Sequence, residues 1–241
     1  MIVIDVSNVS KSFNNRVVLR KINLKIERGE FVVIAGPNGS GKSTLLKTMV
    51  GLLLPDEGEV KVLGFDVKRQ WKKLSKHIGV VLSNERSLYW KLTAWENLDV
   101  FGGIYGVPRR ERKRRAEELL KTFGIYDHKD KLVEEYSTGM RKRLLLCKAL
   151  LHDPEILFID ELLNGLDAKA VGEVNTFLYG LSKSGKTIVM VSHILHEMRD
   201  DVRVLLLRNG RIEMDCSYDE VFSDGEVYRK LSELVSNGGR S

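Results

Sequence analysis

Residues 36–43 read GPNGSGKS and match the phosphate-binding pattern G-x-x-x-x-G-K-[ST] at every required position. The apolar run FVVIA at 31–35 precedes this loop, as expected of a strand that is buried on both faces. The residues after the loop place apolar side chains at helical spacing: Leu45, Leu46, Met49 and Val50. A strand, a glycine-rich loop and a helix thus follow in the order that points backbone N–H groups at a phosphate. This order predicts an α/β sheet with a nucleotide-binding loop at its edge.

A second stretch, GLSKSGKT at residues 180–187, matches the same pattern. It follows the helical pattern AKAVGEVNTFLYGL and runs into TIVMVS at 187–192, whose β-branched residues predict a strand. The order here is helix, loop, strand, and the C-terminus of a helix offers carbonyl groups and negative partial charge to its loop. Because a phosphate is also negative, we predict that the first loop binds nucleotide and that the second is a turn.

The composition is that of a globular protein with a sizeable core. The chain has 241 residues, of which 43% are hydrophobic and 30% charged, enough for one large domain or two closely joined lobes. No apolar run approaches the ~18 residues of a membrane span, and the start MIVIDVSNVSK lacks the features of a signal peptide. The two cysteines, Cys147 and Cys216, are too few for a disulfide framework. We therefore expect a cytosolic protein.

The charge balance is basic, with a net charge of +6 and a pI near 9.2. Such a balance is compatible with a nucleic acid or an anionic membrane surface as partner, and it also occurs in proteins that bind neither. The most charged segment, RRERKRRAEE at 109–118, is either the solvated outer face of a helix or a surface for acidic lipid or RNA. Basic residues at the start of a helix oppose its macrodipole, which favours some role other than helix stability.

Hydrophobic patterning along the chain indicates an interrupted α/β fold. Short alternating runs within residues 1–30 predict half-buried strands of an antiparallel sheet. The strand-like runs EVKVL and IGVVL follow, the pattern is helical over about 92–151, and buried strands return in EILFID, TIVMVS and VRVLLL. We predict one domain over 1–235, with a P-loop core and mainly parallel sheet, an N-terminal antiparallel β subdomain and an inserted α-helical subdomain. A disordered tail is expected at 236–241.

Two acidic residues stand at the end of a buried strand. EILFID ends at Asp160 and Glu161 follows it, and parallel strands deliver their C-terminal residues to the edge where the phosphate loop is expected. Asp160 could then hold a metal ion, directly or through water, and Glu161 could polarise an attacking water. Within the loop, Lys42 should reach the β- and γ-phosphates and the Ser43 hydroxyl should bind Mg²⁺. The alternative is that the Asp–Glu pair merely ends a strand.

Two more polar positions could reach a bound phosphate. Ser137 and Gly139, in EYSTGMRKR, stand at a predicted helix entrance, where a hydroxyl and backbone N–H groups can meet an anion. Taken alone, Ser137 is more simply the N-cap of that helix. His193 follows the strand TIVMVS, which places its imidazole at the same sheet edge, in reach of a γ-phosphate.

Together and in this order, these segments resemble the ATP-binding cassette (ABC) family of transport ATPases over roughly residues 2–215. GPNGSGKST is similar to the Walker A loop, YSTGM to the LSGGQ signature and ILFIDE to Walker B. NGLD is similar to the D-loop, and the dipeptide SH contains the counterpart of the switch histidine. Any one of these motifs is weak evidence, whereas five in order make the resemblance specific.

The resemblance implies a role for each matching residue. Glu161 and His193 would be catalytic, Asp167 would end the D-loop, and Phe13 would stack on adenine, which needs a ring but no hydroxyl. The phosphate-binding set would be Gly36, Pro37, Asn38, Gly39, Ser40, Gly41, Lys42, Ser43 and Thr44. The metal ligands would be Ser43, Asp160 and, through water, Ser83. The signature set, which would contact ATP held by the opposite chain, would be Ser137, Thr138, Gly139 and Met140.

The resemblance also implies cofactors and partners. ATP and Mg²⁺ would bind between two chains that meet head to tail, in a homodimer or in a heterodimer with a second ABC ATPase. An integral membrane permease would convert closure and reopening of the dimer into transport, so the chain would be a peripheral cytoplasmic subunit on the inner face of the cell membrane. No nucleic acid partner is expected. NERSLYWKLTAWENL and YSTGM look most like the exporters of the drug, lipid and polysaccharide branch.

Two positions depart from the family pattern. IGVVLS has Ser83 where the family usually carries a Gln that contacts Mg²⁺ and links to the permease. Leu162 replaces the Pro that usually follows the Walker B acids, which loosens the backbone without removing a charge. Two other functions stay open, the first because of the basic pI and the basic residues at 109–115, and the second because of Ser83. One is a non-transport ABC ATPase that acts on nucleic acid or ribosomes, and the other is a slow or regulatory ATP-binding module.

Overall fold

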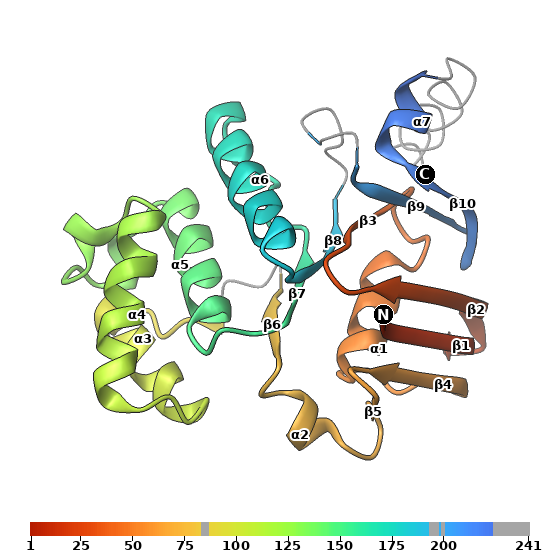
Figure 1. Cartoon of the computed structure of the whole chain (residues 1–241), viewed down its shortest axis with the longest axis horizontal. Helices are drawn as coiled ribbons and strands as arrows, with labels where there is room; N and C mark the ends of the chain where they lie inside the picture. The colour runs from red at the N-terminus through yellow and green to blue at the C-terminus, as the bar shows by residue number, and fades with distance from the viewer. Residues whose placement is uncertain (83–86, 193–197, 199–200, 224–241) are drawn as a thin grey trace.

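The computed structural model describes residues 1–82, 87–192, 198 and 201–223, and these form two sheets flanked by helices (Figure 1). The smaller sheet is antiparallel, with strand order β2-β1-β4-β5. Its strands are β1 (Ile2–Phe13), β2 (Arg16–Glu27), β4 (Glu57–Val62) and β5 (Phe65–Asp66). The predicted N-terminal antiparallel subdomain is confirmed, and the hairpin of β4 and β5 extends it beyond residues 1–30.

The larger sheet has strand order β10-β9-β3-β8-β7-β6. Its strands are β3 (Phe31–Ala35), β6 (Ile78–Val81), β7 (Ile156–Asp160), β8 (Thr187–Val191), β9 (Arg203–Arg208) and β10 (Arg211–Ser217). Neighbours from β9 to β6 are parallel, and only the pairing of β10 with β9 is antiparallel among the described strands. The mainly parallel core is therefore confirmed, with β3 at its centre leading into the phosphate loop.

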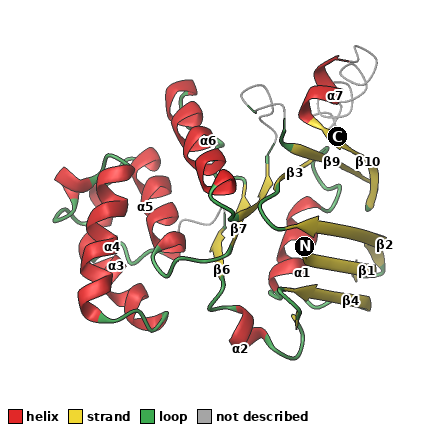
Figure 2. Ribbon diagram, viewed as in Figure 1, coloured by secondary structure: helices red, strands yellow, loops and turns green. Residues whose placement is uncertain are grey.

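Helices flank the sheets and occupy the long connection between β6 and β7. The helices that alternate with strands are α1 (Lys42–Val50), α2 (Trp71–Leu74), α6 (Ala168–Lys183) and α7 (Tyr218–Ser223). The inserted helices are α3 (Ala94–Ile104), α4 (Arg109–Thr122) and α5 (Thr138–Leu150), with 3-10 turns at Tyr126–His128 and Val133–Glu135. The insertion predicted over about 92–151 is therefore helical, and its helices lie together at one end of the molecule (Figure 2).

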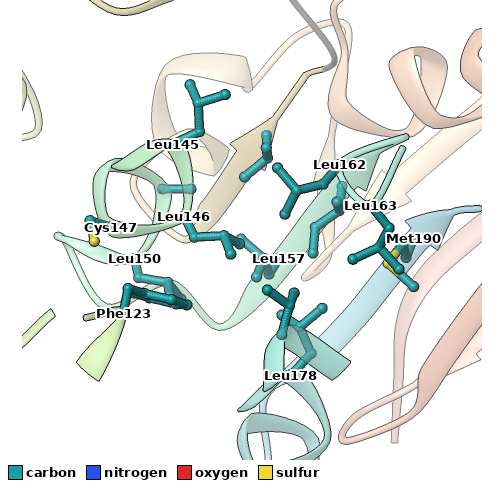
Figure 3. Packing of buried hydrophobic residues seen from close by; sticks show 14 of the residues in the cluster. Phe123, Leu145, Leu146, Cys147, Leu150, Leu157, Leu162, Leu163, Leu178 and Met190 are labelled. Atoms are coloured by element: carbon teal, nitrogen blue, oxygen red, sulfur yellow. The ribbon is translucent and has the colours of Figure 1, made fainter. Parts of the chain in front are cut away.

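The apolar character of the central strands follows from burial on both faces. Every residue of β3 and β7 is buried. Val33 and Ala35 belong to a cluster with residues of α5 and α6, whereas Val32 and Ile34 belong to a second cluster with residues of α1 and the antiparallel sheet. Figure 3 shows part of the first cluster, where side chains of α5 and α6 meet those of β7. A strand covered on both sides has no wet face, so its sequence does not alternate.

A buried asparagine organises the start of the helical insertion. Asn97 of α3 is fully buried, and its Oδ1 accepts a hydrogen bond from the backbone N–H of Tyr89 at 2.8 Å. Its Nδ2 donates to the carbonyl oxygens of Tyr89 and Thr93, both at 2.9 Å. Thr93 also caps α3 in a capping box with Glu96. Side-chain hydrogen bonds thus hold the chain before α3 against that helix.

Some predictions concern residues outside those described. Ser83, His193 and the tail at 236–241 all fall there, and the single-domain boundary at residue 235 stays a prediction. No helix in the described part of the chain is both long enough and apolar enough to cross a membrane.

Candidate nucleotide-binding site

The phosphate loop connects β3 to α1 at the centre of the larger sheet. Gly36, the first residue after β3, has φ 144°, and a Cβ on it would lie 2.1 Å from the carbonyl oxygen of Leu207. Gly41, at the N-cap of α1, has φ 107°, and a Cβ there would lie 2.9 Å from the carbonyl oxygen of Val18. Both positions therefore require glycine, one for close packing on β9 and one for the turn into the helix.

The N-terminus of α1 is arranged for an anion. No side chain caps it and its first turn contains no acidic residue, so neither a carboxylate nor a hydroxyl competes for the first N–H groups. Lys42 begins the helix, and a cation at this end is unfavourable by itself because it opposes the helix dipole. A bound phosphate would satisfy both the N–H groups and the lysine.

Lys42 lies inside the loop. Its side chain is buried, and Nζ donates hydrogen bonds to the carbonyl oxygens of Gly36 and Pro37, each at 2.9 Å. Burial lowers the pKa of Lys42, and the negative charges of Glu161 and Asp160 oppose that shift. The ammonium group is therefore held over the loop with two carboxylates near it, as a ligand for phosphate oxygens requires.

Ser40 offers a second group to a phosphate. The residue is 4% exposed, and its Oγ has no hydrogen-bond partner within the part of the chain that the structure describes. A buried hydroxyl without a partner is costly. This hydroxyl lies in the loop beside Gly36, whose Cβ position is 3.1 Å from it. An oxygen of a bound phosphate would supply the missing partner, so the loop fits the ligand that its sequence pattern predicts.

The other predicted loop residues lie at the turn and at the start of α1. Asn38 and Gly39 are exposed at the tip of the loop. The Ser40 N–H donates to the carbonyl oxygen of Pro37 at 3.2 Å and closes the turn. Thr44 lies in the first turn of α1, where its carbonyl oxygen accepts a hydrogen bond from Thr48 Oγ1 at 2.8 Å.

Ser43 and Asp160 form the candidate metal ligands. Ser43 Oγ donates to Asp160 Oδ1 at 2.8 Å, although the residues are 117 positions apart. Asp160 ends β7 and is almost fully buried, and this burial raises the pKa of its carboxyl group against the hydrogen bond from Ser43. Among the described residues no group of three His, Cys, Asp or Glu side chains could hold a metal ion. One hydroxyl and one carboxylate suit Mg²⁺, which keeps waters and binds phosphate oxygens for its other positions.

Glu161 stands where the chain leaves β7 in an unusual backbone conformation. Its φ is 53°, and its N–H donates to the carbonyl oxygen of Val191 at 3.1 Å. A non-glycine residue in the left-handed region is uncommon and costs conformational energy. Its Oε2 accepts a hydrogen bond from Asn164 Nδ2 at 3.3 Å. The fold therefore brings Glu161 to the same sheet edge as Asp160, Ser43 and Lys42.

The signature residues lie at the start of α5. Ser137 is the N-cap, and its Oγ accepts a hydrogen bond from the Met140 N–H at 3.2 Å. Thr138 Oγ1 accepts a hydrogen bond from Arg141 Nη2 at 3.3 Å, and a Cβ on Gly139 would lie 3.6 Å from Leu166. The starts of α5 and α1 lie well apart (Figure 1). Within one chain, the capping role of Ser137 is therefore the observed one.

The segment after Glu161 is structural. Leu162 is 2% exposed and belongs to the cluster beneath α5 and α6 (Figure 3). The leucine that replaces the usual proline thus contributes to the core. Asp167 is the N-cap of α6, and its Oδ1 accepts a hydrogen bond from the Ala170 N–H at 2.9 Å.

Phe13 ends β1 and remains 43% exposed. Lys11 Nζ lies 5.4 Å from the centroid of its ring and also forms an ion pair with Asp56 at 2.6 Å. An exposed ring at the end of a strand is available for stacking on a base. The adenine-binding role of Phe13 stays a prediction.

The second pattern match is a turn, as predicted. α6 ends at Lys183, Ser184 is its C-cap, and β8 begins at Thr187. Lys186 Nζ donates to Asp153 Oδ1 at 2.6 Å and to the carbonyl oxygen of Pro154 at 2.7 Å. Lys186 therefore links this turn to the segment that precedes β7.

The sequence did not indicate how the phosphate loop is braced. The carbonyl oxygen of Ser40 accepts a hydrogen bond from the Gly210 N–H at 3.2 Å, and the carbonyl oxygen of Gly210 accepts one from the Arg20 N–H at 2.8 Å. With Leu207 packed on Gly36, the β9–β10 turn joins the loop to β2. These are backbone contacts, which many sequences can make, so no residue pattern could have revealed them.

Comparison with known proteins gives matches over most of the chain. A family model described as ABC transporter matches residues 19–164. The ABC transporter ATP-binding protein NatA of Bacillus subtilis is 37% identical over 222 residues, which cover 90% of this chain and 90% of that protein. The energy-coupling factor transporter ATP-binding protein EcfA1 of Fusobacterium nucleatum is 34% identical over 92% of this chain and 85% of its own length.

A solved structure is also similar to this chain. It is a dimer of an ATP-binding cassette in a post-hydrolysis state bound to ADP and Pi. The TM-score is 0.80 with 30% identity, covering 89% of this chain and 98% of that one. The matched family range contains both the phosphate loop and the acidic pair at the end of β7. The chain therefore belongs to the ABC transporter family, as an ATP-binding subunit of the ABC ATPase type.

Proposed function

We propose that this chain hydrolyses Mg·ATP to power a membrane exporter through ATP-driven closure of a dimer. The observation that carries the proposal is the meeting of Lys42, Ser43, Asp160 and Glu161 at one sheet edge. The hydrogen bond of 2.8 Å from Ser43 to Asp160 joins the loop to the strand that ends at the acidic pair. The charges of Asp160 and Glu161 act on Lys42.

The proposed hydrolysis divides the work among these residues. The backbone N–H groups of the loop and Lys42 would hold the phosphates. Ser43 and Asp160 would hold Mg²⁺, which supplies charge neutralisation on the phosphates when bound. Glu161 would accept a proton from a water whose oxygen attacks the γ-phosphorus. The bond from that phosphorus to the bridging oxygen then breaks, and ADP leaves with the bonding electrons.

The proposed dimer would bring the signature residues of one chain to the phosphate loop of the other. The signature residues at the start of α5 lie apart from the phosphate loop in Figure 1, so a second chain would present its Ser137 to the nucleotide. Support comes from the similar ATP-binding cassette that was solved as a dimer. The second chain would be either an identical copy or a different ABC ATPase.

The proposed partner is an integral membrane permease, with this chain peripheral on the cytoplasmic face of the membrane. The proposed direction, export, rests on the likeness of NERSLYWKLTAWENL and YSTGM to the drug, lipid and polysaccharide branch. Since a relative of similar identity is an energy-coupling factor transporter protein, the direction requires an experiment of its own.

Purification under mild detergent from the native host is expected to recover the chain with a multi-span membrane protein. The purified complex is expected to hydrolyse ATP. In inside-out vesicles, ATP should drive substrate into the lumen if the complex is an exporter. Hydrolysis without a membrane partner would point to the non-transport alternative, and ATP-driven efflux from these vesicles would contradict export.

The second candidate, a slow or regulatory ATP-binding module, is motivated by Ser83, which lies outside the described residues. A serine in place of the usual glutamine leaves a gap that a water can bridge, at a cost of ~0–2 kcal/mol in ordering. Ser83→Gln is expected to raise kcat and to leave ATP affinity nearly unchanged, because the attacking water would be better positioned. Steady-state kinetics on both proteins measures this. An unchanged or lower kcat would show that Ser83 is not a simple truncation of the usual ligand.

A further inference from the structure

The surface around α2 carries positive charge, most of which has no ion-pair partner among the described residues. Residues 68–76 contain five cations and no acidic residue: Lys68, Arg69, Lys72, Lys73 and Lys76. We call these five, all of which are exposed, the α2 cations. Within the residues that the structure describes, their only ion pair is a contact of 3.7 Å between Arg69 and Asp66. Asp66 Oδ1 is also engaged by the Lys68 backbone N–H at 2.8 Å.

The basic helix α4 shows how the same chain neutralises a solvated face. Arg114 contacts Glu111 and Glu118, each at 2.5 Å, and Arg115 contacts Glu111 at 2.7 Å. Arg112 also lies 3.5 Å from Asp99, so half of the six basic residues of the run at 109–118 have an ion pair among the described residues, in agreement with a solvated outer face. The α2 cations have no acidic neighbour within 68–76, so simple solvation explains them less well.

Trp71 stands among the α2 cations in the sequence and joins them to the end of α1, where two exposed leucines follow. Trp71 is 45% exposed although it is fixed in place, because its Nε1 donates to the carbonyl oxygen of Val50 at 3.1 Å. Its ring packs on Gly51, where an added Cβ would lie 2.8 Å from Cδ1. Leu52, which follows that glycine, and Leu54 are 47% and 45% exposed. An indole with an amphipathic ring, next to leucines and lysines, is typical of a membrane interface.

We propose that the α2 cations, Trp71, Leu52 and Leu54 form a binding surface for an anionic lipid bilayer. The ammonium groups would contact phosphate headgroups, and the indole and the two leucines would enter the boundary between headgroups and acyl chains. Single-stranded RNA could use the cations and the ring, but it would leave Leu52 and Leu54 in water. The leucines therefore favour lipid as the occupant.

The position of this surface leaves the nucleotide site accessible. α1 has nine residues, which span about 13 Å at the rise of an α-helix. The phosphate loop lies at its N-terminus, and Val50 and Gly51, which hold Trp71, lie at its C-terminus. A bilayer in contact with the α2 cations would thus meet the opposite end of α1 from the phosphate loop. The proposal does not depend on the proposed exporter function, since the isolated chain would bind vesicles in either case.

Vesicle flotation of the purified full chain tests the proposal. The chain is expected to float with vesicles of phosphatidylcholine and phosphatidylglycerol at low salt, and to stay unbound with phosphatidylcholine alone. Each lysine near an anionic surface contributes about 1 kcal/mol, or roughly fivefold. The variant Lys68→Gln/Lys72→Gln/Lys73→Gln should therefore lower the partition coefficient on the order of 10²-fold. A parent chain that does not float with the anionic vesicles would overturn the proposal.

A matched triple variant distinguishes the contribution of this surface to vesicle binding from the contribution of overall net charge. Arg109, Arg110 and Lys113 of α4 are exposed and have no ion pair in the described structure, so changing all three to Gln removes the same charge elsewhere. This variant is expected to bind vesicles like the parent. If both triple variants lost vesicle binding equally, overall charge would explain the loss, and the proposal of a specific surface would be contradicted. ATP hydrolysis by both variants, measured in solution, reports separately on the proposed function.

The fluorescence of Trp71 gives a further test, because attraction between charges alone would not shift its emission. The chain has three tryptophans, and Trp90→Phe with Trp95→Phe leaves Trp71 as the sole indole. Its emission should shift to shorter wavelength with anionic vesicles, and Leu52→Gln/Leu54→Gln should weaken binding. An unshifted emission would contradict insertion of the indole. The parent chain could instead bind single-stranded RNA in preference to vesicles, and the lysine variant could lose that binding. This result would assign the surface to nucleic acid and overturn the lipid proposal.

Discussion

Glu161→Gln is expected to lower the rate of ATP hydrolysis by ~10²-fold or more while ATP still binds, because the amide cannot accept the proton of the attacking water. The substitution keeps the size of the side chain and can keep the contact with Asn164 Nδ2, which is 3.3 Å from Oε2. It leaves Lys42, Ser43 and Asp160 unchanged. Single-turnover hydrolysis and equilibrium ATP binding, measured on the same preparation, separate the two effects.

The same variant tests the proposed dimer. Uncleaved ATP should hold two chains together, so gel filtration with ATP and Mg²⁺ should show a dimer for Glu161→Gln. Glu118→Gln, on the exposed face of α4, is the matched control and should hydrolyse ATP like the parent. A Glu161→Gln protein that remained monomeric with bound ATP would count against the head-to-tail arrangement, and one that retained full hydrolysis would remove Glu161 from the proposed mechanism.

Lys42→Ala is expected to abolish tight ATP binding. The buried ammonium group, held by the carbonyl oxygens of Gly36 and Pro37, is the cation that the phosphate loop presents to the β- and γ-phosphates. Hydrogen bonds to charged groups are worth about 1.5–3 kcal/mol each, so losing two or more would weaken affinity by about 10²-fold or more. Equilibrium titration with a fluorescent ATP analogue measures the change.

Lys186→Ala in the second pattern match is the control. Lys186 is used in an ion pair of 2.6 Å with Asp153, whose side chain is 58% exposed, and such surface pairs contribute at most about 1 kcal/mol to stability. The variant should bind ATP like the parent and unfold at a slightly lower temperature. Reduced ATP affinity in a folded Lys186→Ala protein would show that the second loop also binds nucleotide.

Most of the architecture could be predicted because it depends on local order. The apolar run before Gly36 and the helical spacing after Lys42 identify the strand and the helix on either side of the phosphate loop. The same test separated this loop from the match at 180–187, where helix and strand are exchanged. Asp160 and Glu161 could be placed because a parallel strand directs its C-terminal end to a known edge of the sheet.

Other features of the site depend on contacts between distant segments. The Ser40 hydroxyl lies buried without a partner, and Gly210 braces the carbonyl oxygen of the same residue. Glu161 adopts φ 53°, which its neighbours in the sequence do not require. Leu162 is part of the core, so the departure from the family's usual proline has a packing reason that the motif alone conceals.

The sequence by itself determined in what order the strands and helices follow and which residues are candidates for binding phosphate, because periodicity and glycine spacing are local properties of a chain. Only the tertiary structure decided which of those residues meet. It joined Ser43 to Asp160 across 117 positions, paired Lys186 with Asp153, and set the start of α5 apart from the start of α1 (Figure 1). It also left Trp71 and the α2 cations exposed together at the far end of α1. Such meetings follow from how buried faces pack, and packing joins residues that no local pattern relates.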